Sequence, residues 1–561
     1  MLVGGVPVSV GAPSHLAERA GWSLVWLAVA TIGSDVWGNW SGWPGLAFVT
    51  PLLVLIGLAG TVMIWTVRDP TTRRWNRFGL AASTGTFAVI GGADIASRHV
   101  YSTDSAAFND VAATLLAHGH NPYTSSLHGV ANLLHDSPAY WTYLLSGGHV
   151  TQVSYPAGAF LLQAPLVALG LHHLSTDWLD LAAWIATIVL LYRFLPAALR
   201  WVAPLLGLAG TYFFSFADGG TDALFLPFLV LAVWRWDRFV TPGTSRLYRW
   251  LSPVALGVAC SVKQSPWFCV PFIVLAVALE ARAVGGGVAR TTTRYALWLF
   301  GTFGVINVAF ILWNAAAWWH GVMLPLVSPL VPDGQGLVTL ALHGATGGVD
   351  LRLLWIAAAL LGVTLLTALA LWFTQLKRVW LFLVPIVLFV PGRSLSNYLL
   401  DFFPVALIAA LSVAKPEREP IALARRVRLG LVALPLAATA AVASLSLVSA
   451  PLNVRVESVA TGPGYASFKW IVLSVRNDTG RAIAPRFMIT VAGGHPTGFW
   501  PATSSSGHNP LAPGATEKVV IRPGSFTWAP HRGTYWLVSA YTSSPDAVST
   551  SAPQRWPYGP R

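Results

Sequence analysis

Stretches of about twenty consecutive apolar residues recur along the first 450 residues of the chain, and no other feature restricts its fold as strongly. As a helix, a run of this length spans a hydrocarbon core of roughly 30 Å. Charged residues make up 10% of the chain, against roughly 25% in soluble globular domains, so a water-soluble core cannot account for these runs. The sequence therefore predicts a polytopic integral membrane protein.

The apolar runs predict an all-α membrane domain of about thirteen transmembrane helices. A further apolar segment at 155–172 is expected to lie against the membrane without crossing it, because a crossing would place Arg193 and Arg200 outside. The predicted spans are 21–40, 46–67, 79–97, 176–195, 201–217, 221–237, 250–264, 265–280, 295–313, 350–373, 379–392, 398–414 and 428–450.

The positions of the basic residues indicate the orientation of these spans. Cytoplasmic loops carry an excess of Lys and Arg. With the N-terminus inside, 21 of the 25 Lys and Arg before residue 450 are cytoplasmic. We therefore expect a multi-pass protein of the cell (inner) membrane. Its N-terminus is cytoplasmic and its C-terminus is extracytoplasmic. This assignment also explains the net charge of +13 without nucleic acid as a partner.

Four cations fall on the outer side: Arg98, Lys263, Arg352 and Arg393. A cation in this position often has an anionic partner at the membrane surface. Arg352 is expected to extend to lipid headgroups. The other three are candidates for a bound anion.

The composition changes after Ala450, where short alternating segments are separated by turn clusters such as 477–480 (NDTG). Period-two segments at this spacing predict an extracytoplasmic β-sandwich of about 100 residues. Trp500, Trp528 and Trp536 could stack on a polymer, but we favour the simpler interpretation that they form the core of a rigid cap. The predicted strands are 452–459, 468–476, 486–492, 517–522 and 535–541.

The longest outer loop, 98–175, contains eight of the fourteen histidines but no Glu. Their spacing fits no common zinc site, and we expect neither a metal nor another cofactor. Loops as long as 98–175 in a compact domain are usually functional.

Cys260 and Cys269 both lie in apolar runs, where we expect them to be small core residues.

Residues 104–119 of the outer loop 98–175 predict an amphipathic helix on the membrane surface, ending at Gly119. Asp104 lies where an N-cap belongs, and capping alone could explain it. Asp94 lies in the apolar run of the third span, where an unpaired carboxylate is costly. Its simplest role is to pair with Arg98, four residues later.

Five segments together resemble the actinobacterial polyprenyl-phosphate-dependent mannosyltransferases, which belong to the GT-C class of membrane glycosyltransferases. Ala157 departs from this pattern, because the family usually has a second proline there. The resemblance covers roughly residues 78–414. The segments are 104–123 (DSAAFNDVAATLLAHGHNPY), 155–166 (YPAGAFLLQAPL), 216–224 (FADGGTDAL), 257–272 (GVACSVKQSPWFCVPF) and 393–398 (RSLSNY).

The resemblance implies a GT-C-like catalytic module at 78–450, flanked by a two-helix membrane extension at 1–77 and the β domain at 451–561. It implies that Asp104 is the catalytic base, with Asp94 as the alternative. Arg98, Lys263 and Arg393 would bind the donor phosphate, since developing phosphate charge needs cations. The expected substrate contacts are His99, close to Asp104, and, within the matched segments, Asn121, Tyr123, Tyr155, Asp218, Asp222, Gln264, Asn397 and Tyr398.

The implied function is inverting transfer of a sugar, mannose favoured, from a polyprenyl-phosphate donor to a cell-envelope glycan or glycolipid on the outer face. An arabinofuranosyltransferase of the same class, or a lipid-linked glycan ligase or flippase, is the alternative. A transporter needs ionisable residues along a path through the membrane, whereas those of the predicted spans lie near the ends. A mere envelope anchor would not need thirteen spans.

Overall fold

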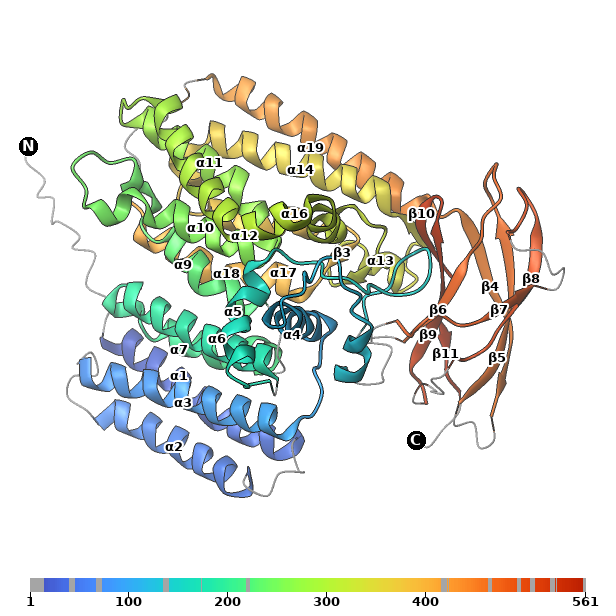
Figure 1. Ribbon diagram of the computed structural model, residues 1–561, viewed down its shortest axis with the longest axis horizontal. Coiled ribbons are helices and arrows are strands. Elements are labelled where there is room, and N and C mark those ends of the chain that lie inside the picture. Colours follow the sequence, from blue (N-terminus) through green and yellow to red (C-terminus); the bar gives the residue numbers. More distant parts are fainter. Residues whose placement is uncertain are drawn as a thin grey trace, which may run out of the picture.

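The computed structural model describes residues 15–39, 46–66, 73–134, 141–172, 174–217, 222–414, 421, 423–462, 467–491, 496–504, 510–524, 530 and 532–557 of the 561-residue chain. A body of helices lies at one end and a strand-rich region at the other (Figure 1). Long helices such as α14 and α19 run side by side toward the strands.

The N-terminal part is a group of packed helices comprising α1 (His15–Asn39), α2 (Leu46–Thr66), α3 (Arg73–Ser97), α6 (Ser175–Phe194) and α7 (Val202–Leu208). Helices α1 and α2 approach closely because glycines face the α1 backbone and rings. A Cβ on Gly57 would lie 2.5 Å from the Trp26 carbonyl oxygen. This contact requires a residue without a side chain.

Shorter helices fill the middle of the body, and several are broken by 3-10 turns. Helix α4 (Asp104–Ala117) packs against α5 (Gly158–Ala168) and α6. The others are η1 (His128–Leu133), η3 (Ala197–Leu199), α8 (Gly210–Ala217), η4 (Ala223–Phe225), α9 (Leu226–Val233), η5 (Trp236–Phe239), η6 (Arg246–Arg249), α10 (Leu251–Val262), η7 (Ser265–Cys269) and α11 (Val270–Ala283).

Helix α12 (Val288–Val327) is the longest, and its backbone leaves helical geometry at Asn314. The helix continues to Val327, beyond the predicted span 295–313, because the backbone returns to helical geometry after Asn314. The remaining helices are α13 (Thr339–Leu342), α14 (Leu351–Leu371), α15 (Phe373–Leu376), η8 (Trp380–Phe382), α16 (Leu383–Leu388), α17 (Ser396–Leu400), α18 (Phe402–Ser412) and α19 (Arg425–Val448).

Six helices in the described part of the chain are long and apolar enough to cross a membrane, or seven if the bent pair Ala197–Leu208 and Gly210–Phe216 forms one span. These coincide with seven of the thirteen predicted spans. The other predicted spans coincide with helices that are short, interrupted or interspersed with charged residues. The six are Phe48–Thr66, Arg74–Ser97, Ser265–Ala283, Val288–Val327, Leu351–Leu371 and Arg425–Val448.

All five predicted C-terminal strands are present, and two sheets surround one apolar core. One sheet has the order β4-β5-β8-β7; the other has β11-β9-β10-β2, with β6 paired to β9. The strands are β4 (Leu452–Thr461), β5 (Phe468–Asn477), β6 (Arg486–Val491), β7 (Ala502–Ser504), β8 (Thr516–Ile521), β9 (Tyr535–Ser543), β10 (Asp546–Thr550) and β11 (Gln554–Arg555).

Trp500 and Trp536 lie in this core, together with Trp556 and Phe468. The interpretation of the first two as core residues is therefore confirmed. Trp528 lies outside the described residues. Cys260 and Cys269 are both buried and free, also as expected.

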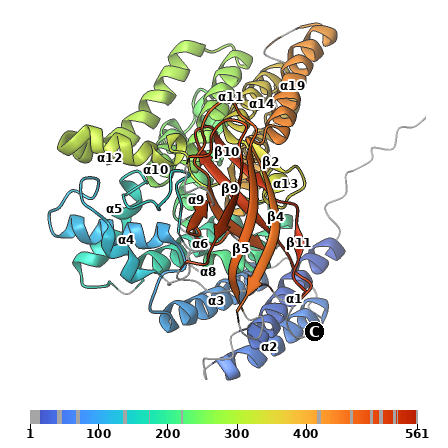
Figure 2. The ribbon, with the colours of Figure 1, turned by 90° about the vertical axis from the view of Figure 1, so that its right-hand side faces the viewer.

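The strand-rich region is joined to the helical body by a strand that the sequence patterns did not predict. β2 (Gly348–Asp350), immediately before α14, pairs antiparallel with β10. Gly348 has φ +151°, and a Cβ there would collide with the Val548 carbonyl oxygen, so only glycine suits this position. Figure 2 shows the strands in front of the middle of the helical body, with α12 at the left, α2 below and α19 at the upper right.

Candidate active site

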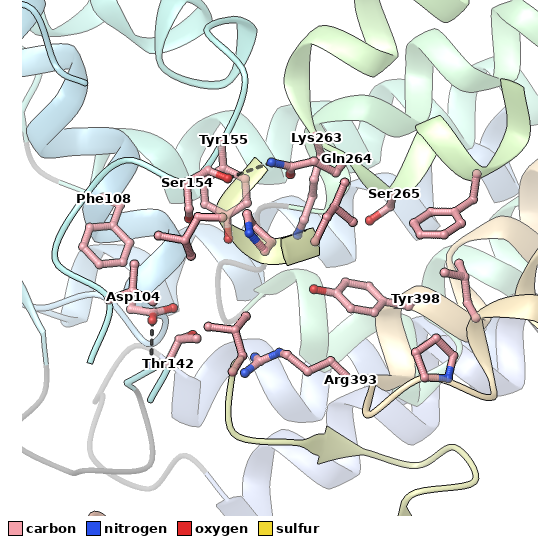
Figure 3. A pocket seen from close by; sticks show the side chains of 18 of the residues that line it. Asp104, Phe108, Thr142, Ser154, Tyr155, Lys263, Gln264, Ser265, Arg393 and Tyr398 are labelled. Atoms are coloured by element: carbon pink, nitrogen blue, oxygen red, sulfur yellow. Dashed lines mark hydrogen bonds between the residues drawn. The ribbon is translucent and has the colours of Figure 1, made fainter. Parts of the chain in front are cut away.

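A cavity of about 830 Å³, its open mouth included, is lined by residues at the ends of α4, α12 and α16. Figure 1 shows α4 and α16 in the part of the helical body nearer the strands. Figure 3 shows the side chains of the cavity converging from widely separated parts of the chain. The lining residues are Asp104, Phe108, Thr142, Val150, Ser154, Tyr155, Lys263, Gln264, Ser265, Phe268, Leu324, Pro325, Leu326, Leu330, Trp355, Leu388, Pro391, Arg393 and Tyr398.

Asp104 is the first residue of α4, and its carboxylate faces the cavity. The N-cap is Thr103, whose hydroxyl accepts from the Ala106 amide at 3.3 Å, so the predicted capping role of Asp104 is wrong. Asp104 Oδ2 instead accepts a hydrogen bond from the Thr142 amide at 2.8 Å. Burial raises the pKa of Asp104, while the Thr142 hydrogen bond and the charge of Arg393 lower it. A carboxyl group with a raised pKa is suited to accept a proton.

The rest of α4 differs from the predicted membrane-surface helix, because its buried face includes the polar residues Asn109 and Asp110. Asp110 accepts hydrogen bonds from Tyr101 Oη at 2.8 Å, Gln163 Nε2 at 3.0 Å and Ser175 Oγ at 3.2 Å. Gln163 and Ser175 thereby fix α4 to α5 and α6, and Tyr101 fixes it to the segment before α4. Asp110 is therefore structural, although it shares a helix with Asp104.

Lys263 ends α10 and turns its ammonium group toward the same cavity. Its Nζ forms an ion pair with Asp222 and lies 5.6 Å from the ring centroid of Tyr155 and 5.8 Å from that of Tyr398. Asn397 Nδ2 donates to the other carboxylate oxygen of Asp222. Asp222 and Asn397 therefore hold Lys263 from behind the cavity wall, and neither residue lines it.

Gln264, Asn121 and Tyr123 fix the backbone around Tyr155. Gln264 Nε2 donates to the carbonyl oxygens of Ser154 at 2.7 Å and Val322 at 2.8 Å. Tyr123 Oη donates to the Tyr155 carbonyl at 2.7 Å, and Asn121 Oδ1 accepts from the Tyr123 amide at 3.0 Å. Tyr155 and Gln264 line the cavity. Asn121 and Tyr123 do not line it, but their hydrogen bonds support its wall.

Arg393 begins β3 (Arg393–Ser394), which pairs in parallel with β1 (Asp333–Gly334). Its Nη1 donates to the Val331 carbonyl at 3.2 Å. Among the residues that the structure describes, Arg393 forms no ion pair. The guanidinium points across the cavity toward the side that carries Asp104 (Figure 3), which leaves its remaining donors available to an anion.

Arg98 does not join Lys263 and Arg393. Its Nε lies 2.8 Å from Asp94 and its Nη2 lies 3.3 Å from Asp177. The predicted Asp94–Arg98 pair is confirmed, and the expected convergence of three cations is reduced to two. His99 is exposed just beyond α3 and does not line the cavity. Asp218 lies outside the described residues.

Several buried carboxylates near this cavity escaped the sequence analysis. Asp180 and Asp401 are buried and interact electrostatically with Asp222 and Lys263. Each lies within a predicted span, and an ionisable residue in an apolar run is itself a signal of a partner or a site. Thr142, Ser154 and Trp355 also line the cavity, but no sequence pattern marks them.

No group of three or more His, Cys, Asp or Glu side chains in the described ranges could hold a metal ion. Comparison of the chain with protein-family models, with curated proteins and with solved structures finds no match. The cavity itself offers one carboxylate of raised pKa, one carboxylate-paired ammonium and one guanidinium that forms no ion pair with the described residues.

Proposed function

We propose that the protein is an inverting glycosyltransferase that moves a sugar, mannose favoured, from a polyprenyl phosphate to a cell-envelope glycan or glycolipid. One observation carries this proposal: Asp104, Lys263 and Arg393, far apart in the sequence, line one cavity. A proton acceptor and cations within one cavity are what transfer from a lipid phosphate requires.

In the proposed reaction, the acceptor hydroxyl attacks the anomeric carbon from the face opposite the leaving phosphate. The new C–O bond forms as the bond to the phosphate oxygen breaks, and the configuration inverts. Asp104 takes the hydroxyl proton, and the polyprenyl phosphate leaves with the bonding electrons. One positioned base contributes roughly 10²- to 10⁴-fold in rate.

The two cations have different roles in this scheme. Arg393 forms no ion pair within the described ranges, so its guanidinium binds the donor phosphate directly, as a planar fork that suits phosphate oxygens. Lys263 keeps Asp222 as its partner, so it adds less net charge. We assign Lys263 to orienting the phosphate between Tyr155 and Tyr398.

The location of the cavity agrees with a lipid donor and a polar acceptor. It lies where apolar helices end and the strand-rich region begins. We propose that about thirteen spans cross the inner membrane, with the N-terminus cytoplasmic, and that the C-terminal β-sandwich caps the outer face. The polyprenyl tail then stays in the bilayer while the sugar reaches the outer surface.

The decisive experiment is sugar transfer by the purified full-length protein in detergent. Synthetic polyprenyl-phosphate mannose and polyprenyl-phosphate arabinofuranose serve as donors, with octyl mannosides as acceptors. Formation of a longer glycoside with release of polyprenyl phosphate is expected. A lipid-linked glycan ligase would transfer only preassembled chains, and a flippase would move lipid between leaflets of a vesicle without cleaving it. Either result would replace the proposal.

A further inference from the structure

A second hollow, of about 650 Å³ with its mouth, opens beside the first cavity. Its wall contains one residue of the strand-rich region, Asp546, and is otherwise formed by the helical body. The two hollows share Pro325, Leu326, Leu330, Trp355 and Arg393. They are therefore neighbouring compartments of one site, and Arg393 stands between them.

The second hollow is lined by different charged residues from those of the first, apart from Arg393. Arg352 at the start of α14 and Asp546 at the start of β10 both line it. Burial raises the pKa of Asp546, Asp350 raises it further, and Arg352 lowers it. The side chain of Arg352, which the sequence assigned to lipid headgroups, thus faces a carboxylate of the other structural region.

Backbone pairing fixes the two segments that carry these side chains. In the register of β10 with β2, Ala547 lies opposite Asp350. Asp350 also caps α14 through a hydrogen bond from the Leu353 amide at 3.0 Å. The hairpin that carries Asp546 is therefore tied directly to the helix that carries Arg352 and Trp355. A preorganised pair of this kind reduces the entropy that a ligand loses on binding.

Asp546 itself is not needed for this architecture. In the described part of the chain, its side chain forms no hydrogen bond or ion pair with protein. A half-buried carboxylate without a protein partner is costly unless a ligand or water supplies donors. Asp546 is partly exposed at the wall of the hollow, so its oxygens can accept hydrogen bonds from a ligand there.

We infer that this second hollow, lined by Arg352, Trp355 and Asp546, binds the sugar units of a polyhydroxylated acceptor. This inference rests on the proposed function and deepens it. Neighbouring hydroxyls can donate to the Asp546 carboxylate and accept from the Arg352 guanidinium. The Trp355 ring offers an apolar face to the C–H groups of a sugar. A phosphate suits the hollow less well, because Asp546 and nearby Asp350 repel it.

The assignment also gives the strand-rich region a role in the reaction. A glycan held between Asp546 and Trp355 extends across the wall that the two hollows share, toward Asp104 in the first cavity. Arg393 lines both hollows and binds the donor phosphate from the wall between them. The acceptor therefore approaches from the strands while the donor lipid approaches from the helices.

The test measures acceptor and donor KM separately for the full-length protein, with octyl dimannoside and polyprenyl-phosphate mannose as probes. Asp546→Ala and Arg352→Ala are each expected to raise the acceptor KM about tenfold or more, since each removes a charged hydrogen-bonding partner. The donor KM should stay within about twofold, because the donor phosphate binds on the other side of the wall. Glu457→Ala is the matched control, because Glu457 lies outside both hollows and pairs with Lys518 on the surface, at 3.0 Å.

An unchanged acceptor KM in both variants overturns the inference. So does a rise in donor KM instead, which would assign the hollow to the lipid donor. If the wild-type protein transfers no sugar, the proposed function fails, and direct binding of octyl dimannoside still decides the inference. Binding that is lost in Asp546→Ala and kept in Glu457→Ala supports it, and absence of binding to wild type refutes it.

Discussion

Replacement of Asp104 by Asn separates catalysis from folding. Thr103, not Asp104, caps α4, so the capping hydrogen bond survives the change. An Asn Oδ1 can still accept from the Thr142 amide, which the carboxylate does at 2.8 Å. Loss of the negative charge at the helix N-terminus costs about 0.3–1 kcal/mol. Relief from burying a charge opposes this cost, so the free energy of unfolding should change by less than about 1 kcal/mol.

The expected loss of activity is much larger. Asn cannot accept the proton, and one positioned base is responsible for roughly 10²- to 10⁴-fold in rate. This corresponds to about 2.7–5.4 kcal/mol in the transition-state barrier. The assay follows release of polyprenyl phosphate from polyprenyl-phosphate mannose, with the melting temperature measured on the same preparation.

Thr103→Ala is the control for a purely structural effect. It removes the cap, at a cost of about 1 kcal/mol, but keeps the carboxylate. It should lower the melting temperature and retain most of the transfer rate. The reasoning is refuted if Asp104→Asn keeps full activity, or if Thr103→Ala loses as much activity as Asp104→Asn.

The raised pKa of Asp104 gives this prediction a pH dependence. Transfer should increase as the pH rises through the pKa of Asp104 in the folded protein, because only the deprotonated carboxylate accepts a proton. Stability should change in the opposite direction. The folded carboxyl group keeps its proton above the ordinary value of 3.8, so its contribution to stability is complete below 3.8 and is lost as the pH rises through the folded-state pKa. Asp104→Asn should remove both dependences.

Three further predictions concern the donor phosphate, the orientation and the Arg98 cluster. Arg393→Ala should weaken the binding of polyprenyl phosphate roughly 10- to 150-fold, from the loss of about 1.5–3 kcal/mol of charge-assisted hydrogen bonding, and an equal affinity in a direct binding assay would remove Arg393 from the site. A cysteine at exposed Thr516 should react with a membrane-impermeant reagent on intact cells while one at exposed Ser245 should not, and the reverse pattern would invert the topology. Asp94→Asn should slow transfer only partly, because Arg98 keeps its contact with Asp177 at 3.3 Å, and a complete loss would make Asp94 the better candidate for the base.

Local patterns predicted the elements of this protein well. The alternation in 468–476 and 535–541 predicted β5 and β9, since side chains on a strand alternate between its two faces. The apolar runs at 350–373 and 428–450 predicted α14 and α19. The i,i+4 spacing predicted the Asp94–Arg98 pair, since residues four apart on a helix are neighbours.

Local patterns were less successful where helices are short or bent. The predicted spans 250–264 and 398–414 correspond to helices of 12 and 11 residues in their main segments, α10 and α18. The continuation of α12 past Asn314 was also missed. Hydropathy measures how apolar a segment is, but the neighbours that pack against a helix decide where it kinks or ends.

Sequence patterns were sufficient to predict most of the long helices and the five main strands of the C-terminal region. They also predicted which tryptophans and cysteines are apolar enough for a core, and which cations needed an explanation. The folded chain was needed to show that Asp104, Lys263 and Arg393 line one cavity while Arg98 pairs elsewhere. It was also needed to show that Asp546 of a distant hairpin meets Arg352 at a second hollow. The physical reason is the range of the interactions. Periodicity and capping act over a few residues, whereas a shared cavity depends on how helix ends, the β2–β10 pairing and buried ion pairs fit together across hundreds of residues.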